Sequence, residues 1–449
     1  MTLKTFELTP AQKGAIAYSK NRDSLPILMK MGRGKSLTAL KILEDKKKKR
    51  ILLICPKSLF KHWAKHIRDH TDYTYTIASG NKAKRINMIL ADVNIVIINF
   101  EGARICGPEL KKIAAGNYFD ALVIDELARV RRYSKQMKAI YNIAQSIPTR
   151  IGLSGLLIAE SLMDAFNPLK IISLGRVLGN DYFKFRDLYF TKEDAPHAYG
   201  KWIPTKFGLK IIPALIKNNA YIVDDDEGLP VSTFTNRFIA LSKEQEAFLA
   251  TLKSDWTAKF PSLKEEDRLK YTIQLIQKAN QCVNGFVYRD DDKVFWFDYN
   301  PKAQELASLV EDLYKEKFVV MCNYKAEKAL IKQLLEKMGK KICTEHDSTN
   351  FDTGDYDCYV GSFSKDSSGH NFGSAKVMIF YSRPNSYEYF AQSQARIRRT
   401  DSKHKSVSYQ IISSRHWVEL KNDEALRQKK DLSEILKGTN LEKLWNTPT

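Results

Sequence analysis

The sequence predicts an α/β fold in which helices cover parallel sheets. Short apolar runs of the length of buried strands recur along the 449 residues, separated by helix-compatible stretches. Polar, chemistry-bearing residues directly follow several of these runs, where parallel α/β sheets place their sites. The chain is also longer than one hydrophobic core usually serves, and 43% of its residues are apolar. We therefore expect two or three domains.

The first of these sites follows the apolar residues around Leu28. The stretch Met31-Gly32-Arg33-Gly34-Lys35-Ser36 leads into a helix-compatible run, which is the context of a P-loop. The glycines let backbone N–H groups approach phosphate, Lys35 would reach the β- and γ-phosphates of ATP, and Ser36 would ligate Mg²⁺. The general pattern has Gly where this chain has Met29. The alternative is a glycine-containing turn before an ordinary helix.

A second nucleotide signature is the apolar run 121–124 that ends in Asp125-Glu126. We expect Asp125 to hold Mg²⁺ through water, and Glu126 to polarise the water that attacks the γ-phosphate. The alternative is an exposed acidic turn. The position after a strand and downstream of a P-loop favours the nucleotide site.

Three residues that lie before or after predicted strands are candidates for binding adenine or a nucleic-acid phosphate. The amide of Gln12 both donates and accepts, so it can pair with adenine; a surface Gln is the alternative. A buried strand is predicted over 50–56, and Lys57 and Ser58 at its carboxyl end can hold a nucleic-acid phosphate.

The segment 392–399 carries three arginines. If it is helical, Arg396 and Arg399 share one face. If they face the P-loop across a cleft, they would place guanidinium groups on the γ-phosphate as arginine fingers. A basic helix lying on DNA is the alternative, and it competes mainly for Arg398.

The middle of the chain predicts helices over 241–285 and a hairpin over 286–300, where aromatic and polar residues alternate. The aromatic residues of 182–190 are interpreted as core packing. Further buried strands are predicted over 318–322, 357–361 and 376–381.

The net charge of +20 favours a polyanionic partner, most simply nucleic acid, although a merely soluble basic protein would share it. The six cysteines form no Cys-x-x-Cys pair and no zinc-type cluster, so we expect reduced, mostly buried thiols. We find neither an apolar signal peptide nor a membrane-spanning run. We therefore expect a protein without a membrane partner that is cytoplasmic, or nuclear if the host has a nucleus.

The order of these motifs, with Asp125-Glu126-Leu127-Ala128-Arg129 and Leu153-Ser154-Gly155 among them, resembles the Swi/Snf-like branch of helicase superfamily two. The resemblance extends from Gln12 to about Lys430. The chain departs from that branch at Ala128, where the family has His, and at Leu156-Leu157, where it has Thr-Pro. Both family elements couple hydrolysis to DNA movement.

The resemblance implies two RecA-like parallel-sheet lobes with a helical insertion and a helical linker between them. It places an ATP-binding lobe at 1–158, its helical insertion at 159–235, a linker with a hairpin at 236–298 and a C-terminal lobe at 299–449. It adds Gly369 to the ATP contacts. It also implies DNA contacts by Lys57, Ser58, Asn99, Asn323, Tyr324, Lys325 and Ser362.

The resemblance thus implies an ATP- and Mg²⁺-dependent DNA helicase or translocase that acts as a monomer on single-stranded or branched DNA without sequence preference. A narrower similarity is to branch-migration helicases of tailed phages, which implies a role in recombination or replication. The alternative is a DNA-binding protein whose ATPase is degenerate, because Met29, Ala128 and Leu156-Leu157 depart from the usual motifs. An ATPase assay with and without DNA separates the two hypotheses.

Overall fold

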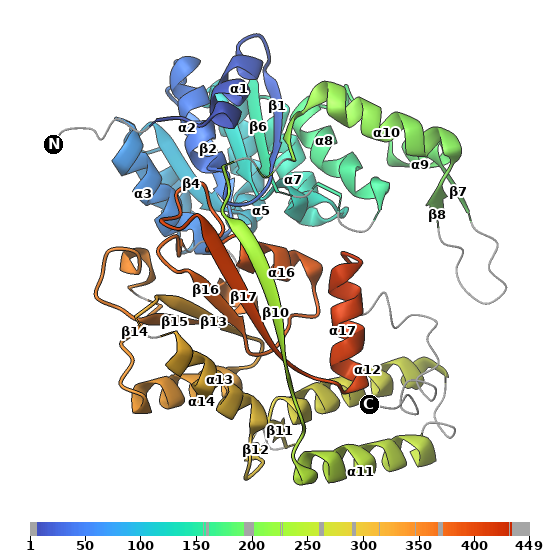
Figure 1. Cartoon of the computed structure of the whole chain (residues 1–449). Coiled ribbons are helices and arrows are strands. Elements are labelled where there is room, and N and C mark those ends of the chain that lie inside the picture. Colours follow the sequence, from blue (N-terminus) through green and yellow to red (C-terminus); the bar gives the residue numbers. More distant parts are fainter. Residues whose placement is uncertain are drawn as a thin grey trace. The chain divides into compact units, whose positions relative to one another are not determined.

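The computed structural model describes residues 7–155, 157–158, 161–192, 202–224, 226, 228–259, 265–289, 293–313, 315–345, 347–366, 371–430 and 432. The chain divides into two compact units, residues 1–227 and 228–449. Figure 1 labels the elements of each unit.

The first unit contains a parallel sheet that has seven strands within the described residues, in the order β3-β4-β2-β5-β6-β1-β9. All strand pairs in this sheet are parallel. The strands are β1 (Ser24–Met29), β2 (Ile51–Cys55), β3 (Tyr75–Ala78), β4 (Ile95–Asn99), β5 (Ala121–Asp125), β6 (Thr149–Ser154) and β9 (Tyr221–Val223).

Helices cover both faces of this sheet, because successive residues of each strand point to opposite sides. Leu52 and Ile54 of β2 join one buried cluster with the helices α5 to α8, and Leu53 joins another with α2 and α3. The helices of this unit are α1 (Pro10–Ser19), α2 (Lys35–Asp45), α3 (Phe60–His70), α4 (Lys82–Ile89), α5 (Phe100–Ile105), α6 (Gly107–Ala115), α7 (Lys135–Ala144), α8 (Phe166–Ser173), α9 (Tyr182–Tyr189) and α10 (Lys206–Asn219), with 3-10 turns η1 (Lys57–Leu59), η2 (Leu127–Val130) and η3 (Leu162–Ala165).

An insertion lies between β6 and β9 in the chain. After α8 it continues through α9, the antiparallel strands β7 (Phe190–Lys192) and β8 (Trp202–Pro204), and α10. Figure 1 shows α9, α10 and this hairpin extending to one side of the first unit. The predicted helical insertion is therefore present as helices, and the chain returns from it to the sheet edge at β9.

The second unit contains a parallel sheet that has six strands within the described residues, in the order β10-β17-β16-β13-β15-β14. Its strands are β10 (Val231–Ile239), β13 (Phe318–Cys322), β14 (Ile342–Cys343), β15 (Cys358–Ser362), β16 (Val377–Phe380) and β17 (Ser406–Ser414), all paired in parallel. Its helices are α11 (Lys243–Lys259), α12 (Glu265–Val283), α13 (Pro301–Asp312), α14 (Lys325–Lys337), α15 (Phe363–Asp366), α16 (Tyr387–Gln394) and α17 (Trp417–Arg427), with a 3-10 turn η5 (Ser348–Asn350).

The fold class predicted from the sequence is confirmed: two parallel sheets, each with helices, and helices between them in the chain. The helices predicted over 241–285 are α11 and α12, and the predicted hairpin is β11 (Phe286–Tyr288) paired with β12 (Val294–Trp296). The strand β10 spans residue 235, where a domain boundary was expected, and pairs with β17. The expected domain boundaries stay predictions.

The thiol prediction is confirmed, since all six cysteines are free and buried. Within the part of the chain that the structure describes, no helix is long and apolar enough to cross a membrane.

Candidate nucleotide and DNA site

The P-loop connects β1 to α2. Gly32 and Gly34 adopt left-handed backbone conformations, with φ of 80° and 70°, a region that strongly favours glycine. Gly34 is also the N-cap of α2. A Cβ atom at Gly34 would lie 2.5 Å from Nε2 of Gln12. The left-handed backbone therefore favours glycine at both positions, as a P-loop or a glycine-containing turn needs, and the phosphate-binding role stays a prediction.

Lys35 and Ser36 open α2 and are half-buried. The Lys35 Nζ donates to the carbonyl oxygens of Met29 at 2.9 Å and Lys30 at 3.3 Å, so the amine lies over the loop. The Ser36 hydroxyl lies 3.4 Å from Nε2 of His62 on α3. The predicted cation and hydroxyl thus lie at the helix N-terminus, where the partial positive charge of α2 adds to that of Lys35.

Met31 and Arg33 complete the loop. A Cβ at Gly155, after β6, would lie 2.9 Å from Cγ of Met31 and 3.6 Å from Nζ of Lys35. The turn after β6 therefore lies against the P-loop. Arg33 is buried.

Asp125 is the last residue of β5, and its side chain is fixed on both oxygens. The indole N–H of buried Trp63 donates to Oδ2 at 2.8 Å, and the Glu126 backbone N–H donates to Oδ1 at 3.0 Å. Burial, with the charge of Asp125 as a second cause, raises the pKa of the neighbouring Cys55 thiol. Asp125 is only 6% exposed, whereas Glu126 is half-buried with a left-handed backbone at φ 66°.

Trp63 contacts the candidate site, although no pattern in the sequence predicts a role for it. Its position, on the helix that follows the strand ending at Cys55, was visible in the sequence. The contact with Asp125 spans 62 positions and two strands, so only the packing of α3 on the sheet reveals it.

Gln12 is 2% exposed, so the surface alternative is wrong. Its Oε1 accepts the Thr9 backbone N–H at 2.9 Å in a capping box at the start of α1. Its Nε2 donates to the Gly34 carbonyl at 3.3 Å. Gln12 therefore connects α1 to the P-loop by a hydrogen bond. Its pairing with adenine stays a prediction.

The sheet order brings these residues to one edge. The strands β1, β6, β5, β2 and β4 are consecutive neighbours and all parallel, so their carboxyl ends meet at the same edge. The P-loop, the turn at Gly155, the Asp125–Glu126 pair, the Lys57–Ser58 turn and Asn99 follow one another along it.

The candidate DNA contacts of the first unit differ in accessibility. Lys57 and Ser58 are exposed at the end of β2. Asn99 is half-buried and caps α5, since its Oδ1 accepts the Gly102 N–H at 3.1 Å and Nη1 of Arg85 at 3.0 Å. Asn99 therefore has a structural role, and its contact with DNA stays a prediction.

In the second unit, the residues after β13 are organised by Glu327. Its Oε2 accepts the backbone N–H groups of Asn323 at 2.9 Å and Tyr324 at 3.1 Å. Burial raises the pKa of Tyr324, and Lys325 at the start of α14 is exposed. Ser362 follows at the end of β15, where its backbone N–H donates to Asp366 Oδ2 at 2.7 Å.

The prediction that Arg396 and Arg399 lie in a helix is wrong. Helix α16 ends at Gln394, and residues 395–399 form turns. The backbone is drawn out of the helix because Arg396 O accepts the Phe372 N–H at 3.0 Å and Ile397 is fully buried.

The two arginines have different surroundings in this turn. Arg396 is half-buried, and its Nε donates to the Gln392 carbonyl at 3.1 Å. Arg399 is buried and pairs with Asp401 at 2.9 Å. Burial alone would raise the pKa of Asp401, but the charge and hydrogen bonds of Arg399, with a bond from Asn371, lower it. Gly369 and Leu156 lie outside the described residues.

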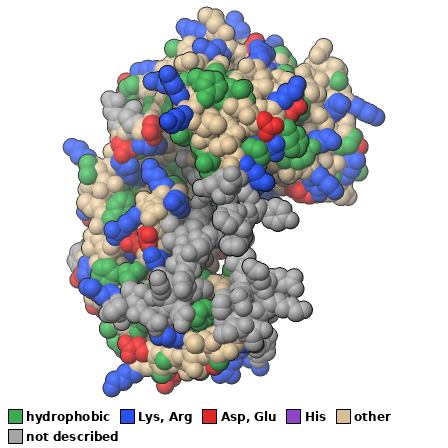
Figure 2. Space-filling model, turned by 90° about the vertical axis from the view of Figure 1, so that its right-hand side faces the viewer, with side chains coloured by type: hydrophobic (Ala, Val, Ile, Leu, Met, Phe, Trp, Pro, Cys, Tyr) green, Lys and Arg blue, Asp and Glu red, His purple; other side chains and the backbone are tan. Residues whose placement is uncertain are grey.

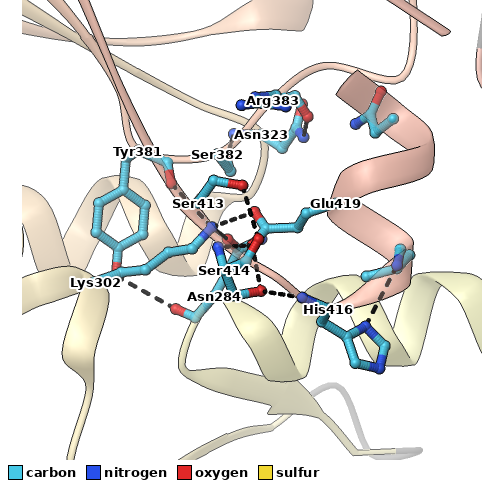
Figure 3. A network of polar contacts seen from close by, with 12 residues as sticks. Asn284, Lys302, Asn323, Tyr381, Ser382, Arg383, Ser413, Ser414, His416 and Glu419 are labelled. Carbon is cyan, nitrogen blue, oxygen red and sulfur yellow. Dashed lines mark hydrogen bonds and ion pairs between the residues drawn. The ribbon is translucent and has the colours of Figure 1, made fainter. Parts of the chain in front are cut away.

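A buried polar network occupies the carboxyl ends of β16 and β17 in the second unit (Figure 3). Lys302, which is fully buried, pairs with Glu419 at 2.5 Å and donates to Asn284 Oδ1 at 2.7 Å. Glu419 Oε2 accepts the backbone N–H of Ser414 at 2.6 Å and its hydroxyl at 2.7 Å. Burial would raise the pKa of Glu419, but Lys302 and Ser414 together lower it. The network joins α13 and α17 to the sheet.

The family of this chain follows from its similarity to a known domain. The SNF2-related domain matches residues 20–286, more than half of the chain. The chain belongs to the SNF2-related domain family. The resemblance to the Swi/Snf-like branch of helicase superfamily two is thereby confirmed, whereas the narrower similarity to tailed-phage proteins stays a prediction.

Solved structures similar to this SNF2-related chain include two of the SWI2/SNF2 ATPase core of Sulfolobus solfataricus. The core in complex with double-stranded DNA is 19% identical and has a TM-score of 0.45, with 99% of this chain and 98% of that chain covered. The core domain alone is 18% identical with a TM-score of 0.45, with 100% of this chain and 94% of that chain covered. No curated protein matches the chain.

Proposed function

We propose that this chain is an ATP-driven DNA motor, a helicase or translocase that unwinds or branch-migrates forked and four-way DNA. The observation that carries the proposal is a P-loop after β1 in the same sheet as Asp125-Glu126 at the end of β5. These strands flank β6 in one parallel sheet, in a chain of the SNF2-related domain family.

The residues at this edge fit ATP and Mg²⁺. Lys35 and the N-terminus of α2 present positive charge to phosphate. The Ser36 hydroxyl and the Asp125 carboxylate are oxygen ligands, the type that Mg²⁺ prefers, and Trp63 holds that carboxylate in one orientation. Bound Mg²⁺ would neutralise charge on the phosphate oxygens. Glu126 would orient the attacking water.

DNA is the polyanion that we propose for the net charge of +20. Lys57, Ser58 and Lys325 are exposed at or just after the carboxyl ends of their strands, and contacts of this type to the phosphate backbone carry no sequence information. Binding would therefore be sequence-independent and would weaken steeply with salt. We propose that a monomer binds single-stranded or branched DNA, in recombination or replication.

The alternative of a degenerate ATPase rests on Met29 and Ala128 together with Leu156-Leu157. Of these residues, the structure describes Met29, Ala128 and Leu157, and all three are buried. Met29 is fully buried in the cluster beneath α2 and α3, so its side chain points away from the phosphate loop. On the family resemblance, we propose that Ala128 and Leu156-Leu157 would weaken coupling to DNA movement more than nucleotide binding.

Weak coupling is compatible with branch migration. At a four-way junction each base pair broken is balanced by one formed, so the net free energy per step is small. Opening a linear duplex costs about 1.4 kcal/mol of stacking per base-pair step. A motor with modest coupling would therefore process junctions better than blunt duplexes.

The test compares gel-resolved products from equal amounts of a four-way junction, a fork and a blunt duplex, with ATP and with a non-hydrolysable analogue. We expect more product from the junction and the fork, and only with ATP. Equal yields on all substrates, or processing with the analogue, would contradict the branched-DNA proposal. ATPase activity that is undetectable with and without DNA would support the degenerate alternative.

A further inference from the structure

The α9–α10 insertion has apolar side chains both in the core and on its surface, although the aromatic residues of 182–190 were expected to pack in the core. That expectation holds for Phe185 and Phe190, which are buried in the same cluster as the sheet. It is wrong for Phe183, which is 64% exposed. Phe207 on α10, for which no prediction was made, is 52% exposed. The helices have enough apolar residues to pack on the unit with one side and leave others on the outer side.

The exposed apolar residues of the described chain concentrate here. Six of its eighteen exposed large hydrophobic residues lie between positions 182 and 209. An exposed apolar concentration of this kind on a charged protein marks an interaction surface. The insertion surface consists of Tyr182, Phe183, Leu188, Ile203, Phe207 and Leu209, with Lys184, Lys206 and Lys210 among them.

Two of the exposed rings are held by neighbours. The ring of Phe207 stacks on Tyr189, with centroids 5.7 Å apart and an interplanar angle of 7°. The Arg186 guanidinium lies 5.1 Å from the ring centroid of Phe183 and 4.1 Å from that of Trp202. Because neighbouring side chains already hold these rings in place, a ligand that binds to them would cause little further loss of side-chain conformational entropy.

On the insertion surface the described acidic residues have hydrogen-bond or ion-pair partners, whereas three lysines form no ion pair with any residue that the structure describes. Among the described residues of the insertion, the acidic residues of α9 and its N-cap are engaged: Asp181 caps α9 by accepting the Phe183 and Lys184 N–H groups, and Asp187 pairs with Arg186 at 2.7 Å. By contrast, exposed Lys184, Lys206 and Lys210 form no ion pair within the described residues. Figure 2 views the molecule from the side on which α9 and α10 lie in Figure 1, and blue basic side chains flank green apolar ones on the first unit.

We propose that the insertion surface is a second DNA-binding site, which takes an unpaired strand by stacking bases on Phe183 and Phe207 and holding phosphates with the lysines. Aromatic faces can stack on unpaired bases, whereas bases in a duplex are already stacked on each other. The positive charge favours a polyanion over an apolar protein segment. This inference rests on the proposed DNA motor and deepens it, since such a site would hold the single strand of a fork.

The test measures binding of the full chain, without nucleotide, to fluorescent oligo(dT), a blunt duplex and a fork, by anisotropy. We expect the Phe183→Ala/Phe207→Ala variant to bind oligo(dT) about tenfold or more weakly, and the fork less strongly, with duplex binding unchanged. The matched control, Phe183→Tyr/Phe207→Tyr, keeps both rings and should bind like the native chain. Circular dichroism checks that each variant is folded.

Three outcomes would overturn the inference. They are unchanged oligo(dT) binding by the alanine variant, an equal loss on duplex and single strand, and loss of concentration-dependent self-association in sedimentation without any change in DNA binding. The last outcome would assign the surface to a second copy of the chain. Failure of the motor itself is distinguishable, because it appears as absent ATP-dependent strand processing in the native chain while the binding difference persists.

Discussion

The carboxyl edges of the two parallel sheets differ in how their lysines are surrounded: one lysine is partly accessible, and the other is buried in an ion pair. In the first unit, Lys35 and Ser36 are half-buried at a helix N-terminus, in a loop shaped by glycines. In the second unit, Lys302 is fully buried and pairs with Glu419 (Figure 3). A buried charge must be paired to be tolerated, so the second edge neutralises itself. The same sheet architecture thus yields a candidate ligand site in one unit and an internal brace in the other.

The largest expected effect is on the first edge. Lys35→Ala should abolish ATP hydrolysis, because the cation expected to contact the β- and γ-phosphates is lost, while DNA affinity stays nearly unchanged. The measurement is phosphate release together with DNA binding by anisotropy. Lys49→Ala, exposed before β2, is the matched control and should behave like the native chain. Joint loss of both activities in folded Lys35→Ala would contradict the assignment.

The next effect concerns the cations that the second unit would contribute to catalysis. Arg396→Ala and Arg399→Ala should each reduce turnover by about 10³ if these arginines act as fingers, with a smaller change in ATP affinity. The exposed Arg427 on α17 supplies the control, Arg427→Ala. An arginine whose removal weakens only DNA binding belongs to a DNA groove instead.

The brace itself can be broken from either side. Lys302→Met should destabilise the chain by about 3–5 kcal/mol, because Glu419 is left buried and unpaired. The double variant Lys302→Met/Glu419→Gln should recover most of that loss, since no charge remains. Lys421→Met removes a more exposed pair with Glu424 and should cost about 1 kcal/mol or less. Urea unfolding followed by tryptophan fluorescence measures all three, and additive losses in the double variant would refute the brace.

A smaller effect sharpens the description of the first edge. Trp63→Phe keeps the buried ring but removes the donor to Asp125. We expect the Mg²⁺ concentration for half-maximal turnover to rise about tenfold, as for a hydrogen bond to a charged group. A purely structural role would instead lower stability and leave the Mg²⁺ dependence unchanged. Trp296→Phe, on the exposed hairpin strand β12, is the control.

The smallest expected effect is a pH dependence of stability that arises from Glu327, one of two buried carboxyl groups in the second unit whose pKa values shift in opposite directions. Burial raises the pKa of Glu327 to about 7, despite hydrogen bonds from Ser382 and two backbone N–H groups, whereas Lys302 helps to lower the pKa of Glu419. Glu327 therefore binds its proton more tightly when folded. Its stabilising contribution is present below pH 4.5 and is lost as pH rises to about 7.

This contribution changes the free energy of unfolding by no more than about 1.4 kcal/mol per pH unit, because one proton is involved. Urea titrations at several pH values should show a decline between pH 4.5 and 7 that is absent in Glu327→Gln. A decline of the same slope in both proteins would assign it to other groups.

Local patterns in the sequence determined the two sheets and the motif positions. The buried strands could be recognised because parallel strands are apolar on both faces, and the P-loop because its glycines, lysine and serine are contiguous. The sequence therefore placed Lys35 at the start of a helix and Asp125 and Glu126 at the end of a strand, as the structure confirms. Their catalytic roles stay predictions.

Tertiary structure alone decided which side chains meet. Trp63 and Asp125, or Lys302 and Glu419, are 62 and 117 positions apart, and no local pattern encodes such a contact. It also ended α16 before Arg396, because the pairing of that backbone with Phe372 and the burial of Ile397 outweighed the helix-compatible sequence. The aromatics of α9 divided between core and surface for the same reason: sequence gives the residue type, but packing decides which face is covered.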